Sequence, residues 1–251
     1  YWFLGRQNEW NIVENRMGLW RFYIWGIDFV MLAFAFYAGK AFSSEQYSKF
    51  NILYSIIFVA GILCYCSRKH IVAVVIVIAY AILTMESKYK WRIRISCLVV
   101  MAILFYSFYD DYLAMSVEAD DLQGSGEDFI RYLAARYFIM DFSSSPLYPI
   151  FGNKLEYCKH VLQFYVSDVG IIGYYSTVGI VGVSAIIFYI YKFVRNWKYI
   201  DLGYKMFFIM KIALIVFDFW MCWAIGIIAY GTFLYLLDEN IKENKLIKKK
   251  L

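Results

Sequence analysis

The chain has 251 residues, 62% of them hydrophobic, and a mean hydropathy of +0.55. Soluble domains are roughly 45–50% apolar, so a chain of this length could not bury such an excess in its own core. The formal net charge of +5 comes from basic clusters that flank apolar segments. Such clusters are typical of membrane anchoring, so we expect membrane lipid, and no nucleic acid, as their partner.

Apolar runs of about the length of a bilayer crossing recur along the chain, since a transmembrane helix needs about 20 such residues. The runs cover residues 19–41, 50–66, 70–85, 95–109, 169–193 and 206–237. We therefore predict an all-α fold, a polytopic transmembrane helical bundle with a long, partly helical external loop. The chain begins at Tyr1 without an initiator Met, and we expect further helices before it.

The last apolar run is too long for one crossing and carries Asp218 near its middle. We interpret it as a hairpin of two short spans with Asp218 near the turn. Lys211, close to its start, is expected to extend its amine toward the nearer membrane surface. The predicted segments are N-terminal helices, an external catalytic loop, and C-terminal helices with a basic tail, at residues 1–109, 110–168 and 169–251.

Lysine and arginine set the expected orientation, because both accumulate in cytoplasmic loops. Basic clusters lie at residues 88–94, at residues 192–205 and in the tail from Lys242 onward, whereas Asp110–Asp168 is rich in acidic residues. We predict that the basic clusters are cytoplasmic and that the acidic segment is external.

One basic cluster breaks this pattern. Ser67-Arg68-Lys69-His70 lies one span away from the cytoplasmic cluster at residues 88–94, so we predict that it faces outside. Basic residues on that side oppose the insertion bias. Arg68 is therefore either an interfacial anchor or part of an external site that binds an anion.

The external segment is longer than a simple connector, and loops of this length are usually functional or disordered. Residues 128–141 have an apolar face at helical spacing, and residues 143–149 interrupt that pattern. Residues 154–166 are interpreted as a second amphipathic helix carrying His160. We thus predict two short helices at the membrane surface.

Three residues of this segment are candidates for a site. Arg131 has Glu127 and Asp128 within helical reach, so an ion pair is its simpler interpretation. Arg136 has no acidic residue one turn away, which leaves an interfacial anchor and a ligand-binding role both open. His160 is one of two histidines, and a structural role is the simpler one. No metal-ligand spacing or nucleotide-binding motif occurs, so we expect no metal and no cofactor.

The order of these residues resembles the C-terminal signature of the O-antigen polymerase and O-antigen ligase family. The elements are Arg136-Tyr137-Phe138, then Ser145-Pro146-Leu147 through Ile150-Phe151-Gly152, then His160, then Asp168-Val169-Gly170-Ile171-Ile172-Gly173. Cys66-Ser67-Arg68 resembles an earlier Ser-Arg element of that family. The resemblance covers about residues 50–190. Gly152-Asn153-Lys154 departs from the usual Gly-x-Gly, and His160-Val161 departs from the usual His-Asn.

The resemblance implies a multi-pass glycosyltransferase of the bacterial cytoplasmic (inner) membrane that makes surface polysaccharide such as O-antigen or capsule, alongside other polysaccharide-assembly membrane proteins. Its substrate would be an oligosaccharide linked to a polyprenyl diphosphate. Arg68 and Arg136 would stabilise the diphosphate leaving group, and His160 would accept the acceptor proton or orient the diphosphate. Additional substrate-binding residues would be Arg131, Lys69 and Lys159.

Other functions remain open from the sequence. A ligase of the same family would use the same residues on a different acceptor. A non-enzymatic transporter or flippase of the same anionic glycolipid is expected to place polar or broken helices at the bilayer midplane. A structural membrane subunit would leave Arg68 and Arg136 without a shared site. In an enzyme, Arg68, Arg136 and His160 should converge on one outward cavity.

Overall fold

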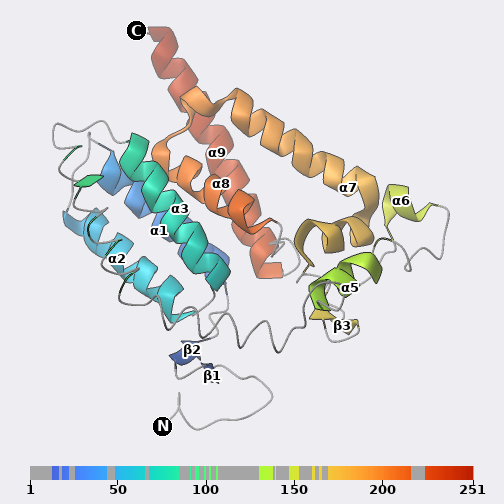
Figure 1. Cartoon of the computed structure of the whole chain (residues 1–251). Helices are drawn as coiled ribbons and strands as arrows, with labels where there is room; N and C mark the ends of the chain where they lie inside the picture. The colour runs from blue at the N-terminus through green and yellow to red at the C-terminus, as the bar shows by residue number, and fades with distance from the viewer. Residues whose placement is uncertain are drawn as a thin grey trace. The chain divides into compact units, whose positions relative to one another are not determined.

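The computed structural model describes residues 13–16, 19–22, 26–43, 49–65, 68–84, 91, 94–95, 99, 102, 106, 130–137, 139, 147–152, 160–161, 164–165, 169–215 and 224–250. The helices are α1 Ile27–Phe42, α2 Lys49–Cys64, α3 Arg68–Thr84, α5 Ile130–Arg136, α6 Tyr148–Phe151, α7 Gly170–Arg195, the 3₁₀ turn η4 Trp197–Tyr199, α8 Leu202–Leu214 and α9 Ala224–Lys250 (Figure 1). Two short antiparallel pairs join β1 Val13–Arg16 to β2 Leu19–Phe22 and β3 His160–Val161 to β4 Phe164–Tyr165. The predicted helical class is confirmed.

The first predicted span, residues 19–41, does not form one helix. Its beginning is strand β2, and α1 starts only at Ile27, after Gly26 in a left-handed conformation with φ 83° and ψ 30°. Trp20 and Phe22 favour a strand, and Gly26 adopts the positive φ that allows the chain to turn into the helix. Helices α2 and α3 lie close to the predicted runs, whereas the run at residues 95–109 falls mostly outside the described residues.

The chain divides into two units. The first unit contains Tyr1–Ala81, Ile187–Ile215 and Trp220–Leu251, and the second contains Ile82–Ile186 and Val216–Phe219. This grouping follows packing and therefore joins both ends of the chain in the first unit. In the second unit, Arg94 donates hydrogen bonds to the carbonyl oxygens of Ile82 (3.2 Å) and Leu83 (2.5 Å) at the end of α3.

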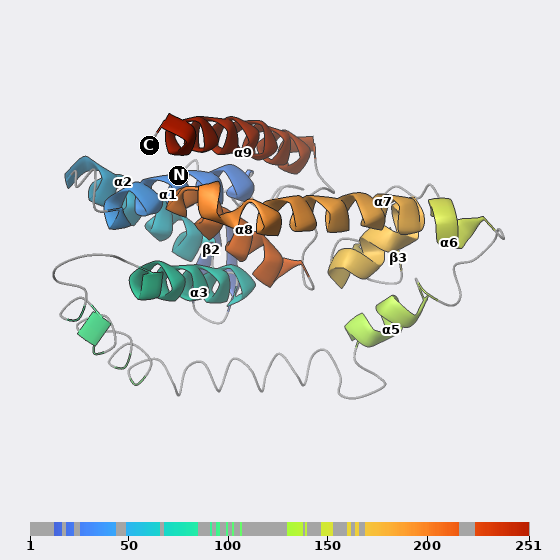
Figure 2. The same ribbon diagram turned by 90° about the horizontal axis from the view of Figure 1, so that it is seen from above.

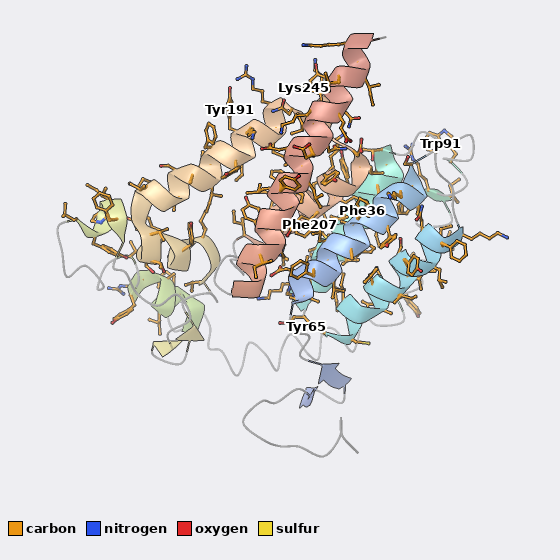
Figure 3. All side chains as sticks on the ribbon, turned by 180° about the vertical axis from the view of Figure 1, so that it is seen from behind. Phe36, Tyr65, Trp91, Tyr191, Phe207 and Lys245 are labelled. Carbon is orange, nitrogen blue, oxygen red and sulfur yellow. The ribbon has the colours of Figure 1, made fainter. Side chains whose placement is uncertain are left out.

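Helix α1 is the centre of the first unit, and α2 packs along it in the antiparallel direction. Near the end of α1, the ring of Tyr37 stacks on Phe58 with centroids 5.8 Å apart. Near the start of α1, Val30 is next to Gly61 of α2. The core of the unit is apolar and includes Met31 and Phe207, both essentially inaccessible to solvent; Figure 3 labels Phe207.

Helices α1 and α8 touch through their backbones. A Cβ added at Gly39 would collide with the backbone nitrogen and Cα of Gly203, and one added at Gly203 would lie 3.1 Å from the carbonyl oxygen of Ala35. Gly39 thus leaves no room for a side chain, and the contact at Gly203 is tight. Small residues at helix crossings are the usual means of close packing where lipid supplies no hydrophobic force between helices.

Helices α8 and α9 form the predicted helical hairpin. Helix α8 ends at Leu214 and α9 begins at Ala224, so the apolar run at 206–237 is divided as expected. The contacts run antiparallel, because Phe207 packs on Phe233 with centroids 4.6 Å apart, while Asp201 at the start of α8 meets Asn240 farther along α9. Asp218 lies outside the described residues.

Large apolar side chains remain exposed along two helices. In α2 they recur one helical turn apart at Phe50, Leu53 and Ile57, and in the second part of α7 at Phe188 and Tyr191. Soluble monomers rarely expose contiguous apolar surface of this extent. Among the described helices, α7 alone is both long and apolar enough to cross a membrane, while α2 and most of α3 are shorter apolar helices.

Candidate functional site

The predicted external cations of the first unit begin helix α3. Arg68 is its first residue, followed by the half-exposed Lys69 and the buried His70, whose ring packs edge-on against Tyr65 at 5.1 Å. The N-terminus of a helix already carries partial positive charge. Arg68 and Lys69 are therefore at the end of the helix that is less favourable for basic residues.

The two arginines of the external segment lie on α5 in the second unit. Within the predicted helix at residues 128–141, the structure describes α5 over Ile130–Arg136, and several of the remaining residues lie outside the described part. Arg136 is exposed at the C-terminal end, where the partial negative charge of the helix favours a cation. Its side chain is therefore open to the surroundings of the second unit. Glu127 and Asp128, the expected partners of Arg131, lie outside the described residues.

His160 lies on a strand, so the prediction of an amphipathic helix over residues 154–166 is wrong. His160 and Val161 form β3, which pairs with Phe164 and Tyr165 of β4 in the register His160 with Tyr165. Valine and aromatic residues favour extended backbone, and here this preference overrides the helical spacing of the apolar residues. Lys159, which directly precedes β3, lies outside the described residues.

The Pro-to-Gly element packs directly on α7. Its residues form the short helix α6, with Pro149 in the first turn and Gly152 after the end at φ 72° and ψ −177°. A Cβ on Gly152 would collide with the Thr177 carbonyl and would lie 2.5 Å from the nitrogen of Val178. The turn and the helix therefore meet backbone to backbone, with no room for a side chain at Gly152.

The same contact breaks α7. Gly179 has φ 65° and ψ −166°, a conformation almost restricted to glycine, and a Cβ there would collide with the carbonyl of Ile150. Just before the break, the hydroxyls of Ser176 and Thr177 donate to the carbonyl oxygen of Gly173 at 2.6 and 3.0 Å. Figures 1 and 2 show the two parts of α7 meeting at a sharp bend.

Tyr148 anchors α6 on the first part of α7. Its side chain is 2% exposed, and its ring meets Tyr175 edge-on with centroids 6.1 Å apart. Burial, together with the nearby Tyr175, raises the pKa of Tyr148 to about 12. The hydroxyl stays neutral up to strongly alkaline pH, so Tyr148 positions the turn through packing rather than through charge.

Most of the sequence-predicted site belongs to one unit. Arg131, Arg136, α6, His160 and the first part of α7 are all in the second unit, whereas Arg68 and Lys69 are in the first. Convergence of Arg68 with Arg136 and His160 therefore stays a prediction. Within the described residues, no group of three His, Cys, Asp or Glu side chains could hold a metal ion.

A buried ion pair in the first unit is a feature that the sequence analysis missed. The Lys211 amine of α8 pairs with the carboxylate of Asp28 in the first turn of α1, and the two side chains are 5% and 18% exposed. Lys211 is thus paired with a carboxylate of a neighbouring helix, and its extension toward a membrane surface stays a prediction. Two opposite charges inside separate apolar runs were the signal for this pair.

Comparisons with protein-family models, with curated proteins and with solved structures each found no match to this chain.

Proposed function

We propose that this chain is a polytopic membrane glycosyltransferase that polymerises lipid-linked oligosaccharides at the outer face of a bacterial cytoplasmic membrane. The main support is the junction between α6 and α7. The Pro-to-Gly turn, one of the sequence elements that carry the family resemblance, packs through Gly152 on α7 at Thr177–Gly179, a few residues after the glycine-rich element at Gly170–Gly173. This contact lies in the unit that also contains Arg136 and His160.

The reaction would transfer a glycosyl group without a cofactor. A hydroxyl oxygen of the acceptor glycan attacks the anomeric carbon of the donor, and the bond from that carbon to the diphosphate oxygen breaks. The electron pair leaves with the polyprenyl diphosphate, whose growing charge is stabilised by arginine guanidinium groups. His160 accepts the hydroxyl proton, because its unperturbed pKa lies near neutrality. A ligase would differ only in the acceptor.

Membrane placement is supported by the exposed apolar stripes of α2 and α7. In the proposed topology, Ser67–Lys69 and Asp110–Asp168 are external, and residues 88–94, residues 192–205 and the tail are cytoplasmic. In a cysteine-free background, Ser125→Cys is expected to react with an impermeant thiol reagent added outside intact cells, and Lys90→Cys only after the cells are opened. Labelling at position 90 but not at position 125 would reverse the orientation.

The catalytic proposal is tested by three substitutions. Arg136→Ala and His160→Ala are each expected to lower polymer formation about 100-fold or more, because each removes stabilisation of the transition state. Arg68→Lys keeps the charge but loses the planar guanidinium, and we expect a similarly severe loss with normal membrane insertion. The measurement is polymer length and amount from purified lipid-linked repeat units in proteoliposomes.

The double variant Arg136→Ala/His160→Ala separates a shared site from two independent ones. Residues that act on one bound substrate are not additive, so the double variant should be scarcely worse than either single variant. Defects that multiply would contradict a shared site, and near-normal activity of Arg68→Lys would reduce Arg68 to an interfacial anchor. Delivery of substrate to the outer leaflet is the control that each variant must pass.

A flippase for the same anionic glycolipid is the second candidate. Two observations favour it: the break in α7 at Gly179 and the buried pair of Asp28 and Lys211, because transporters use broken helices and charges inside the membrane. The proteoliposome assay distinguishes the two functions. A polymerase lengthens glycans already at the active face, whereas a flippase moves labelled glycolipid between leaflets and leaves its length unchanged.

A further inference from the structure

Three lysines surround one tyrosine where η4 meets α9 in the first unit. The amines of Lys198, Lys245 and Lys248 lie 4.9, 5.4 and 5.1 Å from the centroid of the Tyr199 ring. The Lys248 amine also donates to the carbonyl oxygen of Lys198 at 3.2 Å. We call these four residues the Tyr199 cluster; Figure 3 labels Lys245 on α9. All three lysines are exposed, while Tyr199 is half-buried.

Nearby polar contacts hold the turn under this cluster. The Asp201 carboxylate accepts hydrogen bonds from the side-chain amides of Asn240 (2.6 Å) and Asn244 (2.9 Å). The Asn244 amide also donates to the carbonyl oxygen of Tyr199 at 2.9 Å. Because Asp201 is engaged by two neutral amides, α9 fixes the position of Tyr199 without placing a carboxylate on the lysines.

The positive charge of the cluster is therefore not balanced within the described part of the chain. None of its three amines is paired there with a carboxylate, whereas Lys192 and Lys242 are paired with Asp238 (2.8 Å) and Glu239 (2.7 Å). Lysines held this close repel one another. A ligand with concentrated negative charge would remove that repulsion, and phosphate oxygens accept hydrogen bonds from ammonium groups.

The aromatic side chains around the cluster indicate a ligand at the boundary between membrane and water. Leu246 and Ile247 are exposed as well, but the 3.6-residue repeat places them on the face of α9 opposite Lys245 and Lys248. The half-buried Trp197 lies under the amine of Lys205 at 5.5 Å. Tryptophan and tyrosine are enriched where a membrane meets water, and lysines beside them attract anionic lipid. A soluble anion would use the amines but would not need the aromatic side chains beside them.

We infer that the Tyr199 cluster binds the phosphate headgroup of an anionic phospholipid at the cytoplasmic surface of the membrane. The three amines contact the phosphate, and the Tyr199 ring lies next to all three of them. The inference rests on the membrane placement proposed above but not on glycosyl transfer. Loss of lipid binding and loss of polymer formation are thus separate outcomes.

The test measures lipid binding to the full chain in a neutral detergent by native mass spectrometry. Phosphatidylglycerol and phosphatidylcholine with identical acyl chains are the probes. We expect wild-type protein to retain phosphatidylglycerol preferentially. Removal of one lysine at an anionic surface weakens binding about fivefold, so Lys245→Gln/Lys248→Gln should bind it about 25-fold more weakly.

Lys192→Gln/Lys242→Gln is the matched control, since it removes the same net charge from lysines that have carboxylate partners. It should keep at least a third of the wild-type affinity. Equal losses in both variants would mean diffuse attraction and would overturn the inference, as would equal retention of both lipids. Displacement of phosphatidylglycerol by an equal concentration of inorganic phosphate would instead indicate a site for a free ion.

Discussion

Lys211→Met is expected to destabilise the protein by on the order of 3–5 kcal/mol, because it leaves the Asp28 carboxylate without its cation in a mostly apolar environment. The methionine side chain fills nearly the same volume, so the loss reports charge rather than packing. The carboxylate is only 18% exposed and cannot recover full hydration without a local opening of α1 from α8. The measurement is thermal or denaturant unfolding of the purified protein, followed by tryptophan fluorescence.

A second substitution should reverse much of this loss. In Asp28→Asn/Lys211→Met no charge remains buried, and replacement of a buried ion pair by neutral groups is often close to neutral. Lys192→Met is the matched control, since its pair with Asp238 is 41% and 46% exposed and should contribute about 0–1 kcal/mol. Additive losses in the double variant would show that Asp28 and Lys211 do not depend on each other.

Gly179→Ala is expected to prevent the second unit from adopting its native packing. The alanine Cβ would collide with the Ile150 carbonyl and would lie 2.6 Å from the Gly152 nitrogen, both rigid backbone groups. The backbone conformation at residue 179 adds about 1–3 kcal/mol of strain for any residue other than glycine. We expect a total loss of several kcal/mol, seen as rapid proteolysis and as aggregation in size-exclusion chromatography.

Gly231→Ala controls for the chemical change itself. Gly231 lies within α9, and a Cβ added there meets nothing within 4 Å. Alanine is the better helix former by about 1 kcal/mol, so this variant should be as stable as wild type or more stable. If Gly179→Ala behaves like Gly231→Ala, then α7 does not need its break, and the packing of α6 on α7 cannot be what positions the external turn.

The sequence was sufficient to predict the helical class and the division of the last apolar run. These features depend on local composition, since a run of apolar residues without breakers forms a helix and 32 such residues exceed one crossing. Strand β2 and the strand carrying His160 were missed, because the apolar residues of such short segments fit both the spacing of a helix and the alternation of a strand. Hydrogen bonding to a partner strand decides between them, and the partner is not evident in the segment itself.

The candidate site was predictable only in part. The order of Arg136, the Pro-to-Gly turn and His160 can be read from the sequence, whereas the packing of that turn on α7 is seen only in the structure. The break at Gly179 was not predictable, since a glycine needed for its backbone angle and one needed for close contact are identical in sequence. The Asp28–Lys211 pair required knowledge of which helices are neighbours.

The two contacts between α1 and α8 determine how these helices can move. One is the approach of Gly39 to Gly203, and the other is the pair of Asp28 and Lys211 near the opposite end of α1. At 1.5 Å of rise per residue, the two attachment points on α1 are about 16 Å apart. With only one of these contacts, α1 could rotate on α8 about that contact. The second contact opposes this rotation, and sliding of one helix along the other would force a side chain against the glycine contact. We therefore expect helices α1 and α8 to move as one rigid body, with any hinge of the first unit outside this pair.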